Sequence, residues 1–352
     1  MNPNLRFVRV SEENIERLAE GISELHLAAF GKRFDRDYWR WRYLEGPVGR
    51  GNLIVALRGD KVVGKYGLTY LPLIAGGKET MGGLMEISIH PQERSWQCYK
   101  GLVRASIAES QNDKLAFRFG IISSRLVEMN RRLGVLVLGR IPFYIGVINV
   151  AKLLEGCYVS YPLSLSGWLA QPFLGLRIKK KDNYGLDIRS VEQFDSSFDE
   201  LWNTIAKNRN ISVIKNAKYL NWRYVRCPSR KYRRLVAYRD KRMDGFIIFC
   251  ATDPRHKSFM FELMARNDDS LVMKALISQM LKELKNEDKS HVLASFPAES
   301  PVAFVMKEAG FKSWGTMLWP MYAVVALESS REMYQNTTLK NWDFSLGEWM
   351  VY

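Results

Sequence analysis

Apolar and polar residues follow one another along this chain in an order that predicts strands and helices in turn. In the first half, apolar runs predict strands at residues 61–75, 78–90 and 115–122, and a further strand from residue 135. Amphipathic segments predict helices at 95–111 and 125–133. Gly76-Gly77 separates the first two strands, and such a glycine pair favours a tight hairpin.

The second half repeats this order of elements. Strands are predicted at 245–252, 258–266 and 291–296 and from residue 311, with helices at 270–285 and 301–309. In each half the hairpins come first and a crossover helix follows, which implies at least one parallel strand pair. The predicted fold class is therefore α/β of the mixed α+β kind. It has two tandem domains, each a mixed, mostly antiparallel sheet flanked by helices.

The repeat is also visible residue by residue. A displacement of 181 positions brings Tyr38, Trp41, Arg42, Tyr43 and Pro47 onto Tyr219, Trp222, Arg223, Tyr224 and Pro228. With Val55, Ala56, Arg58 and Gly64, which meet Val236, Ala237, Arg239 and Gly245, nine of 27 positions are identical without a gap. The aromatics of the repeated helix lie largely toward one side, which predicts that they pack in the core.

The repeat sets the predicted domain limits. They are residues 1–150 for the first domain, 151–183 for a linker, 184–327 for the second domain and 328–352 for a tail. The linker carries an apolar stretch that runs into a basic cluster, and residues 161–181 are typical either of a packed linker helix or of an interfacial membrane anchor. We expect the linker helix. The tail is expected to pack back on the body through its aromatics, Trp342, Phe344 and Trp349.

Composition adds limits on location and partners. The chain has 352 residues, with 52 Lys and Arg against 37 Asp and Glu, and this net charge of +15 favours anionic partners. It has none of the arginine-rich arms or zinc fingers of a dedicated nucleic-acid module. The longest apolar stretch, 135–150, is interrupted by Arg140 and Pro142 and predicts one buried strand with its connection. With four scattered cysteines and no signal peptide, we expect a cytoplasmic protein without metal or disulfides.

Two local signatures resemble the GCN5-related N-acetyltransferase (GNAT) superfamily in a tandem arrangement. The strand at 84–90 ends in His90-Pro91-Gln92-Glu93-Arg94, which is similar to the family's His-Pro-x-x-Arg entry to its pyrophosphate loop. The turns Leu133-Gly134-Val135 and Ala309-Gly310-Phe311 resemble the family's Leu-Gly-Phe ending. The resemblance covers nearly the whole chain. It implies a bacterial N-acyltransferase that uses acyl-CoA, with acetyl-CoA as the expected donor.

The resemblance also implies where acyl-CoA binds. The backbone of Ile87, Ser88 and Ile89 would face the pantetheine arm, and Arg94, Ser95, Trp96, Gln97 and Cys98 would cradle the pyrophosphate at a helix N-terminus. The glycines of the family loop are missing here, and Trp96 is large where a close approach is wanted. In the second half, Asp268 and Asp269 put carboxylates in the corresponding place. We therefore expect at most one acyl-CoA site, in the first half.

An amine must lose a proton before it attacks a thioester, so a base is expected in the central strand. Glu86 is the candidate, with Glu262 as its counterpart, and a structural hydrogen bond between sheet and loop is the alternative role. The family's tyrosine acid would fall at Asn130, which cannot replace it. Ser123 and Ser124, at the end of the preceding strand, are the substitutes we consider.

These features predict transfer of an acyl group to an amine of a small or nucleotide-linked acceptor, such as an amino sugar or a polysaccharide precursor. The basic charge favours an anionic acceptor, and the groove between the domains is its expected place. Two alternatives stay open. One is a transferase that resembles the Fem family and takes its group from aminoacyl-tRNA. The other is a binding protein whose two sites have both decayed.

Overall fold

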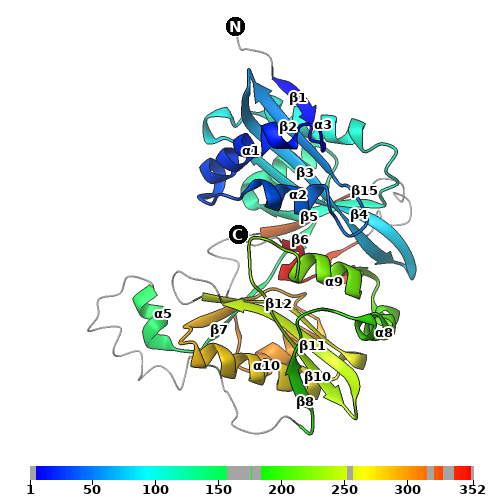
Figure 1. Cartoon of the computed structure of the whole chain (residues 1–352), viewed down its shortest axis with the longest axis vertical. Coiled ribbons are helices and arrows are strands. Elements are labelled where there is room, and N and C mark those ends of the chain that lie inside the picture. The colour runs from blue at the N-terminus through cyan, green and yellow to red at the C-terminus, as the bar shows by residue number, and fades with distance from the viewer. Residues whose placement is uncertain are drawn as a thin grey trace.

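The computed structural model describes residues 5–156, 176, 184–251, 257–314, 321–327 and 337–349. Most of the predicted linker and the start of the tail, including nearly all of 161–181, lie outside the described residues. Figure 1 shows two sheets placed one above the other, with the C-terminal segment between them. We call the elements from β1 to β6 the first copy and those from β8 to β14 the second copy.

The first sheet has the order β1-β2-β3-β4-β5-β15-β6, with two short strands, β9 and β16, attached beside β3. Its strands are β1 Arg6–Arg9, β2 Asn52–Arg58, β3 Lys61–Ala75, β4 Lys78–Ile89, β5 Phe117–Ser123, β6 Leu136–Arg140, β9 Ile211–Val213, β15 Met321–Leu327 and β16 Trp342–Asp343. The helices of the first copy are α1 Ile15–Phe30, α2 Arg36–Tyr43, α3 Trp96–Glu109 and α4 Val127–Arg132. Along the main order, the pair β4–β5 is parallel and the others are antiparallel.

The second sheet has the order β14-β7-β13-β12-β11-β10-β8. Its strands are β7 Phe143–Val147, β8 Asp187–Ser190, β10 Arg233–Arg239, β11 Arg242–Ala251, β12 Lys257–Ala265, β13 His291–Ala294 and β14 Lys312–Trp314. The remaining helices are α5 Val150–Gly156, α8 Ser196–Ile205, α9 Ala217–Tyr224, α10 Ser270–Asn286 and α11 Pro301–Glu308. The predicted fold class is confirmed, because each copy runs through the same order of strands and helices.

The two copies exchange strands. The apolar stretch 135–150 forms two strands rather than one, and only β6 stays in the first sheet, whereas β7 pairs with β13 and β14 in the second. In return, β15 lies between β5 and β6 of the first sheet. The predicted limits 1–150 and 184–327 therefore do not coincide with the two sheets. An apolar pattern indicates that a strand is buried, but it carries no information about which sheet the strand joins.

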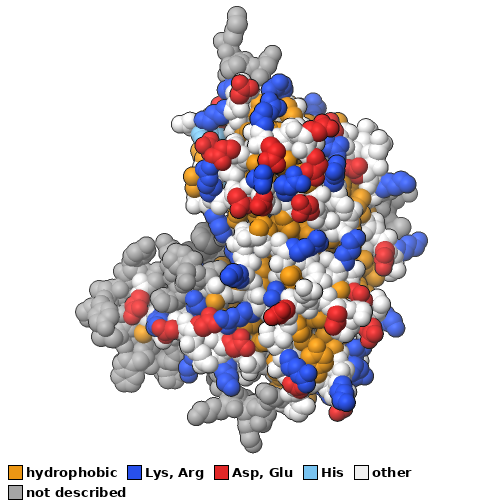
Figure 2. Space-filling view, viewed as in Figure 1, with side chains coloured by type: hydrophobic (Ala, Val, Ile, Leu, Met, Phe, Trp, Pro, Cys, Tyr) orange, Lys and Arg blue, Asp and Glu red, His pale blue; other side chains and the backbone are white. Residues whose placement is uncertain are grey.

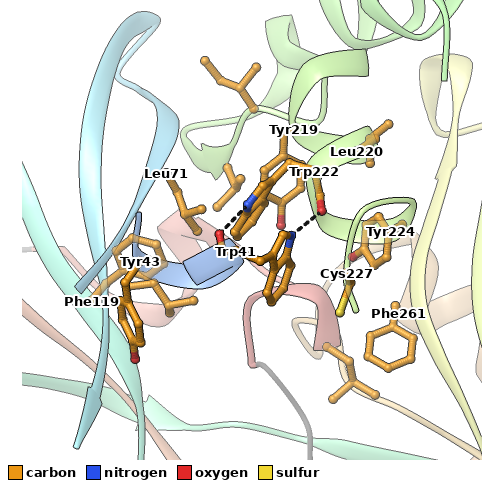
Figure 3. Packing of buried hydrophobic residues seen from close by; sticks show 14 of the residues in the cluster. Trp41, Tyr43, Leu71, Phe119, Tyr219, Leu220, Trp222, Tyr224, Cys227 and Phe261 are labelled. Atoms are coloured by element: carbon orange, nitrogen blue, oxygen red, sulfur yellow. Dashed lines mark hydrogen bonds between the residues drawn. The ribbon is translucent and has the colours of Figure 1, made fainter. Parts of the chain in front are cut away.

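A shared core fills the space between the two sheets, and the repeated helices α2 and α9 meet at its centre. The rings of Trp41 and Trp222 stack with centroids 4.8 Å apart. Each indole N–H donates to the other residue's carbonyl oxygen, over 2.9 Å from Trp41 and 3.1 Å from Trp222 (Figure 3). Because these residues are 181 positions apart, the contact lies on the local pseudo-twofold axis of the duplication. The predicted core role of the repeated aromatics is confirmed.

The outer faces of the sheets have separate apolar clusters, one under α3 and one under α10 and α11. On the face seen in Figure 2, basic and acidic side chains are interspersed over the first copy, so no patch of one sign stands out there. Among the described helices none is long and apolar enough to cross a bilayer.

Candidate active site

The central strands of the first sheet separate partway along their length. β4 and β5 are paired from Gly82–Phe117 to Leu84–Phe119, and there the ladder stops although both strands continue. On its other edge β4 stays paired with β3 as far as Ile89. Ile87, Ser88 and Ile89 therefore lie where the backbone facing β5 is unpaired, as the predicted pantetheine site requires. An unpaired strand edge of this kind can bind an extended ligand through its main chain.

One wall of this opening is apolar. Half-buried side chains from β4, from the start of α3 and from α4 and its flanks pack there against the cluster under α3: Met85, Ile87, Ile89, Trp96, Leu126, Met129 and Leu133. Trp96 stacks on Tyr99, with ring centroids 6.1 Å apart, so its bulk packs against its own helix. Cys98 is fully buried beside β3, and its side chain takes no part in lining the opening.

The N-terminus of α3 has backbone donors to spare. Ser95 caps the helix, and its hydroxyl oxygen accepts from the N–H of Cys98 over 3.2 Å. Among the described residues no partner is recorded for the N–H groups of Trp96 and Gln97. Arg94 is exposed beside them. Free donors, the helix dipole and a cation together favour a bound anion, so the predicted cradle at 94–98 has suitable geometry.

The corresponding helix of the second copy, α10, is already capped by its own carboxylates. Asp269 accepts from the N–H groups of Leu271 over 2.8 Å and Val272 over 3.3 Å. Asp268 is held by the guanidinium of Arg209 over 2.6 and 3.1 Å. The chain's own negative groups thus stand where a pyrophosphate would bind, in agreement with the expectation of one site at most.

Glu86 lies close to this opening but is held by two cations. Its carboxylate forms ion pairs with Arg42 and Lys65, and it is 10% exposed, whereas Arg42 and Lys65 are 2% and 0% exposed. Burial lowers the pKa of Lys65 to about 8. Two neighbouring cations favour the ionised carboxylate and weaken it as a base. These contacts favour the structural role, and the base role stays a prediction.

Glu262 is the true counterpart of Glu86. Glu86 lies opposite Gly67 in the ladder and Glu262 lies opposite Ile248, and these two partners are themselves 181 positions apart. Glu262 is 1% exposed and receives hydrogen bonds from Lys215 over 2.7 Å and from Tyr224 over 2.5 Å. Burial raises its pKa to about 7. It lies deep between the sheets, far from solvent.

The predicted substitutes for the acid lie at the end of β5. Ser123 is the last residue of the strand and pairs with Met321 of β15, and Ser124 is exposed at the start of the next turn. Asn130 is buried, and its amide donates to the carbonyl of Leu126 over 2.8 Å. Asn130 thus has a structural role, and the roles of the two serines stay predictions.

Sequence reasoning missed a cavity at the point where the strands separate. It has a volume of about 30 Å³ and is bounded on one side by Leu84 and Phe119, the last pair of the ladder, and by Gly120. The tail closes it with Trp342, Asp343, Phe344 and Glu348, and β6 and β15 form the rest of the wall. The predicted packing of the tail is thus confirmed for the described residues 337–349. No motif marks these residues as part of a site, because only the fold brings them there.

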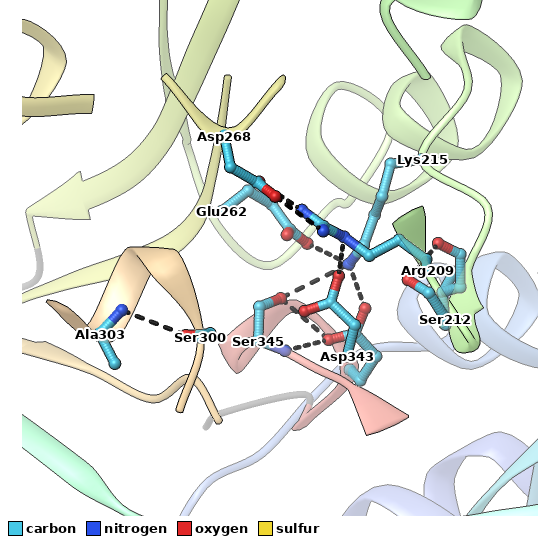
Figure 4. A network of polar contacts seen from close by, with 11 residues as sticks. Arg209, Ser212, Lys215, Glu262, Asp268, Ser300, Ala303, Asp343 and Ser345 are labelled. Atoms are coloured by element: carbon cyan, nitrogen blue, oxygen red, sulfur yellow. Dashed lines mark hydrogen bonds and ion pairs between the residues drawn. The ribbon is translucent and has the colours of Figure 1, made fainter. Parts of the chain in front are cut away.

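Two carboxylates of the tail, Asp343 and Glu348, line this cavity. Figure 4 shows Asp343 beside Arg209 in the polar network around it. Glu348 forms an ion pair with Lys215 and accepts from the backbone N–H and the hydroxyl of Ser345 over 2.7 and 2.9 Å. Asp343 is 3.0 Å from Arg209, which it shares with Asp268, and its side chain is 27% exposed. Glu348 is therefore fully engaged, whereas Asp343 has the freer carboxylate.

A larger hollow of about 630 Å³ lies between the β3–β4 hairpin and α8. Gly76 on the hairpin donates to the carbonyl of Asn210 over 2.9 Å, and Lys207 and Trp202 line the other side. This hollow lies between the copies, where the acceptor was expected, and the acceptor's place stays a prediction.

In the part of the chain that the structure describes, no three His, Cys, Asp or Glu side chains are grouped to hold a metal, and Cys98, Cys227 and Cys250 are free thiols.

Comparison with known proteins finds a similar domain and a similar fold. An acetyltransferase (GNAT) domain model matches residues 14–135. Three solved structures are similar over most of their length: Saccharomyces cerevisiae N-myristoyltransferase with bound myristoyl-CoA, a probable N-acyltransferase from Enterococcus faecalis, and a GCN5-related N-acetyltransferase from Anabaena variabilis.

Their TM-scores are 0.67, 0.61 and 0.60, with 13%, 12% and 13% sequence identity. The alignments cover 92%, 92% and 93% of this chain and 79%, 72% and 73% of the others. At this identity the likeness shows the fold. No curated protein matches the sequence. Residues 14–135 thus match a GNAT acetyltransferase domain, and the chain as a whole has the fold of these N-acyltransferases, with two sheets that agree with a tandem arrangement.

Proposed function

We propose that this acyltransferase moves a short acyl group, in the first instance acetyl, from acyl-CoA to an amine. The observation that carries the proposal is a contrast between two equivalent places. In the first copy the strands part beside a helix N-terminus with free N–H groups, whereas in the second the equivalent N-terminus is occupied by Asp269. The donor therefore binds to the first copy. The yeast N-myristoyltransferase, solved with myristoyl-CoA, supports an acyl-CoA donor for this fold.

In this proposal the backbone of Ile87 to Ile89 pairs with the pantetheine amides. The N–H groups at the start of α3 and the guanidinium of Arg94 bind the pyrophosphate, whose negative charge is stabilised by the helix N-terminus. The thioester then lies near the last β4–β5 pair, beside the cavity that the tail closes. The half-buried apolar side chains around Trp96 exclude water from the pantetheine arm.

Asp343 is the better placed of two candidates for the group that takes the proton from the amine. It lines the cavity and shares one guanidinium, that of Arg209, with another carboxylate, and burial raises its pKa. Glu86, in contrast, is held by two cations of its own. A base works best with a pKa raised toward the working pH, which favours Asp343 acting directly or through one water.

We infer that the acceptor is a small or nucleotide-linked anionic amine, such as an amino sugar or a polysaccharide precursor. The hollow between the copies supports this inference, because its volume suits a small molecule and Lys207 lines it. The net charge of +15 favours an anionic acceptor in the same way.

Calorimetric titration with CoA, with acetyl-CoA and with a tRNA mixture tests the donor. We expect CoA and acetyl-CoA to bind. In a separate unfolding experiment, either ligand at a hundred times its Kd should raise the free energy of unfolding by about 2.7 kcal/mol. Absence of binding by both would overturn the proposal. Tight tRNA binding that weakens steeply with salt would instead support the aminoacyl-tRNA alternative.

A matched pair of variants places the donor on the first copy. Gln97 and Leu271 are the second residues of α3 and α10, and both are exposed. Gln97→Glu puts a negative charge where the pyrophosphate binds, so it should weaken CoA binding at least about tenfold. Leu271→Glu puts the same charge on the other helix and should change nothing. Equal weakening by both variants would contradict a site on the first copy.

A further inference from the structure

The C-terminal tail forms part of the first sheet and so gives the cavity a fixed wall. Within β16, Trp342 lies opposite Ile211 of β9, and β9 in turn pairs with β3. The indole N–H of Trp342 also donates to the hydroxyl of Thr337 over 3.2 Å. A wall held by a ladder and a side-chain hydrogen bond yields less than a loose loop does.

Trp342 faces the place where the central strands part. Its ring lies against Phe117 and Phe119 of β5, with centroids 5.4 and 5.5 Å away, and it is 7% exposed. Phe119 belongs to the last β4–β5 pair, directly beside the proposed position of the thioester. An acyl chain that continues past the thioester on this side of the sheet meets the indole.

We propose that Trp342 limits the length of the acyl chain, so that the donor carries a short acyl group. This inference rests on the proposed function, because it takes the parted strands as the donor site. The cavity of about 30 Å³ has room for the centres of about two water-sized groups. A two-carbon acyl group fits that space, whereas a longer chain has to displace Trp342 or the side chains opposite it.

The other residues that line the cavity leave no space beside Trp342 for a longer acyl chain. Leu138 of β6, Ala323 of β15 and Ile141 line the cavity together with Trp342. Interiors packed in this way resist added volume, because each extra methylene forces side chains off their preferred positions. Substitutions that shorten either wall should therefore admit longer donors.

The test measures binding of acetyl-, butyryl- and hexanoyl-CoA by calorimetry to the wild type, Trp342→Ala and Leu138→Ala. Wild type should bind acetyl-CoA best. In Trp342→Ala the affinity for hexanoyl-CoA relative to acetyl-CoA should rise about tenfold or more, since one methylene of fit is worth about that much. Leu138→Ala should shift the ratio in the same direction by a smaller factor.

Trp202→Ala is the matched control. Trp202 is also a buried tryptophan, at 5% exposure, but it lines the larger hollow and not this cavity. It should leave the ratio unchanged. An unchanged ratio in folded Trp342→Ala, or an equal shift in Trp202→Ala, would overturn the inference.

The remaining outcomes are equally decisive. If Trp342→Ala does not fold, Leu138→Ala decides alone, and an unchanged ratio there overturns the inference. Wild type that binds hexanoyl-CoA as tightly as acetyl-CoA also overturns it. Wild type that binds no acyl-CoA of any length, nor CoA itself, refutes the proposed function instead.

Discussion

The two copies of this fold place a carboxylate at the same position and surround it with different sets of charges. Glu86 in the first copy has two buried cations, Arg42 and Lys65. Glu262 in the second copy shares one lysine, Lys215, with a second carboxylate from the tail. A buried charge requires a partner of opposite sign. The first copy meets this requirement with two cations on one carboxylate, and the second with one lysine shared by two carboxylates.

The lysines come from different places in the two copies, although the carboxylates match. Displaced by 181 positions, Lys65 of β3 falls on Phe246, and Lys215 falls on Phe34. Each lysine therefore has a phenylalanine at its counterpart. The duplication has kept the carboxylate while the cation that neutralises it has moved to another element.

The matched arginines have also diverged. Arg42 pairs with Glu86, whereas Arg223 donates to the carbonyl of Gly347 in the tail over 3.0 Å and to the hydroxyl of Tyr232 over 2.7 Å. A side chain on Gly347 would collide with the Glu262 carboxylate, so glycine lets the tail approach it. In the second copy Arg223 and Glu262 thus contact the C-terminal segment, whereas their counterparts Arg42 and Glu86 pair with each other.

The largest effect should come from the part that the copies share. Trp41→Ala and Trp222→Ala each remove a buried indole and one of the two reciprocal hydrogen bonds, so each should lower the free energy of unfolding by about 3–5 kcal/mol. Denaturant unfolding measures both. Because the residues touch, the double variant should lose less than the sum. Full additivity, or a clearly unequal pair, would contradict a symmetric contact.

A smaller and unequal effect should come from the matched carboxylates. Glu86→Gln removes the buried carboxylate that forms ion pairs with both Arg42 and Lys65, which should cost about 3 kcal/mol of unfolding free energy at pH 7. Glu262→Gln leaves Lys215 paired with Glu348, so we expect a loss of about 1 kcal/mol. Denaturant unfolding of both variants checks the difference. Equal losses would show that the difference between the two sets of charges has no energetic consequence.

The remaining effect is one of pH, and it should be the same in both copies. Burial lowers the pKa of His26 in the first copy and of His291 in the second to about 4. Below pH 6.5 the unfolded chain binds a proton that the folded chain refuses, so stability is full above that pH and falls toward pH 4. Between pH 7 and 5 each histidine should cost about 2 kcal/mol.

Phenylalanine variants test this expectation. His26 packs among Phe30, Phe34 and Trp39, so His26→Phe keeps an aromatic ring without a titrating group. Unfolding at pH 7 and pH 5 should show that His26→Phe and His291→Phe each lose less stability than the wild type. Variants that lose as much as the wild type would assign the acid sensitivity to other groups.

Local pattern was enough to place most elements. The strand at 61–75 and the hairpin at Gly76-Gly77 were predicted where they lie, because alternation and glycine turns depend on neighbours in sequence. The strand that carries Ile87 to Ile89 was also predicted, and its role as the pantetheine edge stays a prediction. The paired cations of Glu86 were not, because Arg42 and Lys65 are 44 and 21 positions away from it and carry no spacing signal.

The sequence by itself determined that the chain is a duplication and which elements each copy contains, and it predicts one anion site at most, in the first copy. These conclusions follow from the local periodicity of apolar residues, from the residues that are identical 181 positions apart, and from the residues of one loop. The tertiary structure decided that β7 and β15 change places and that the tail closes the cavity with Trp342 and Asp343. Which strands pair at a sheet edge and which residues line a cavity depend on contacts between segments far apart in the sequence. The hydrophobicity of such a segment predicts that it is buried, but not which other segment it packs against.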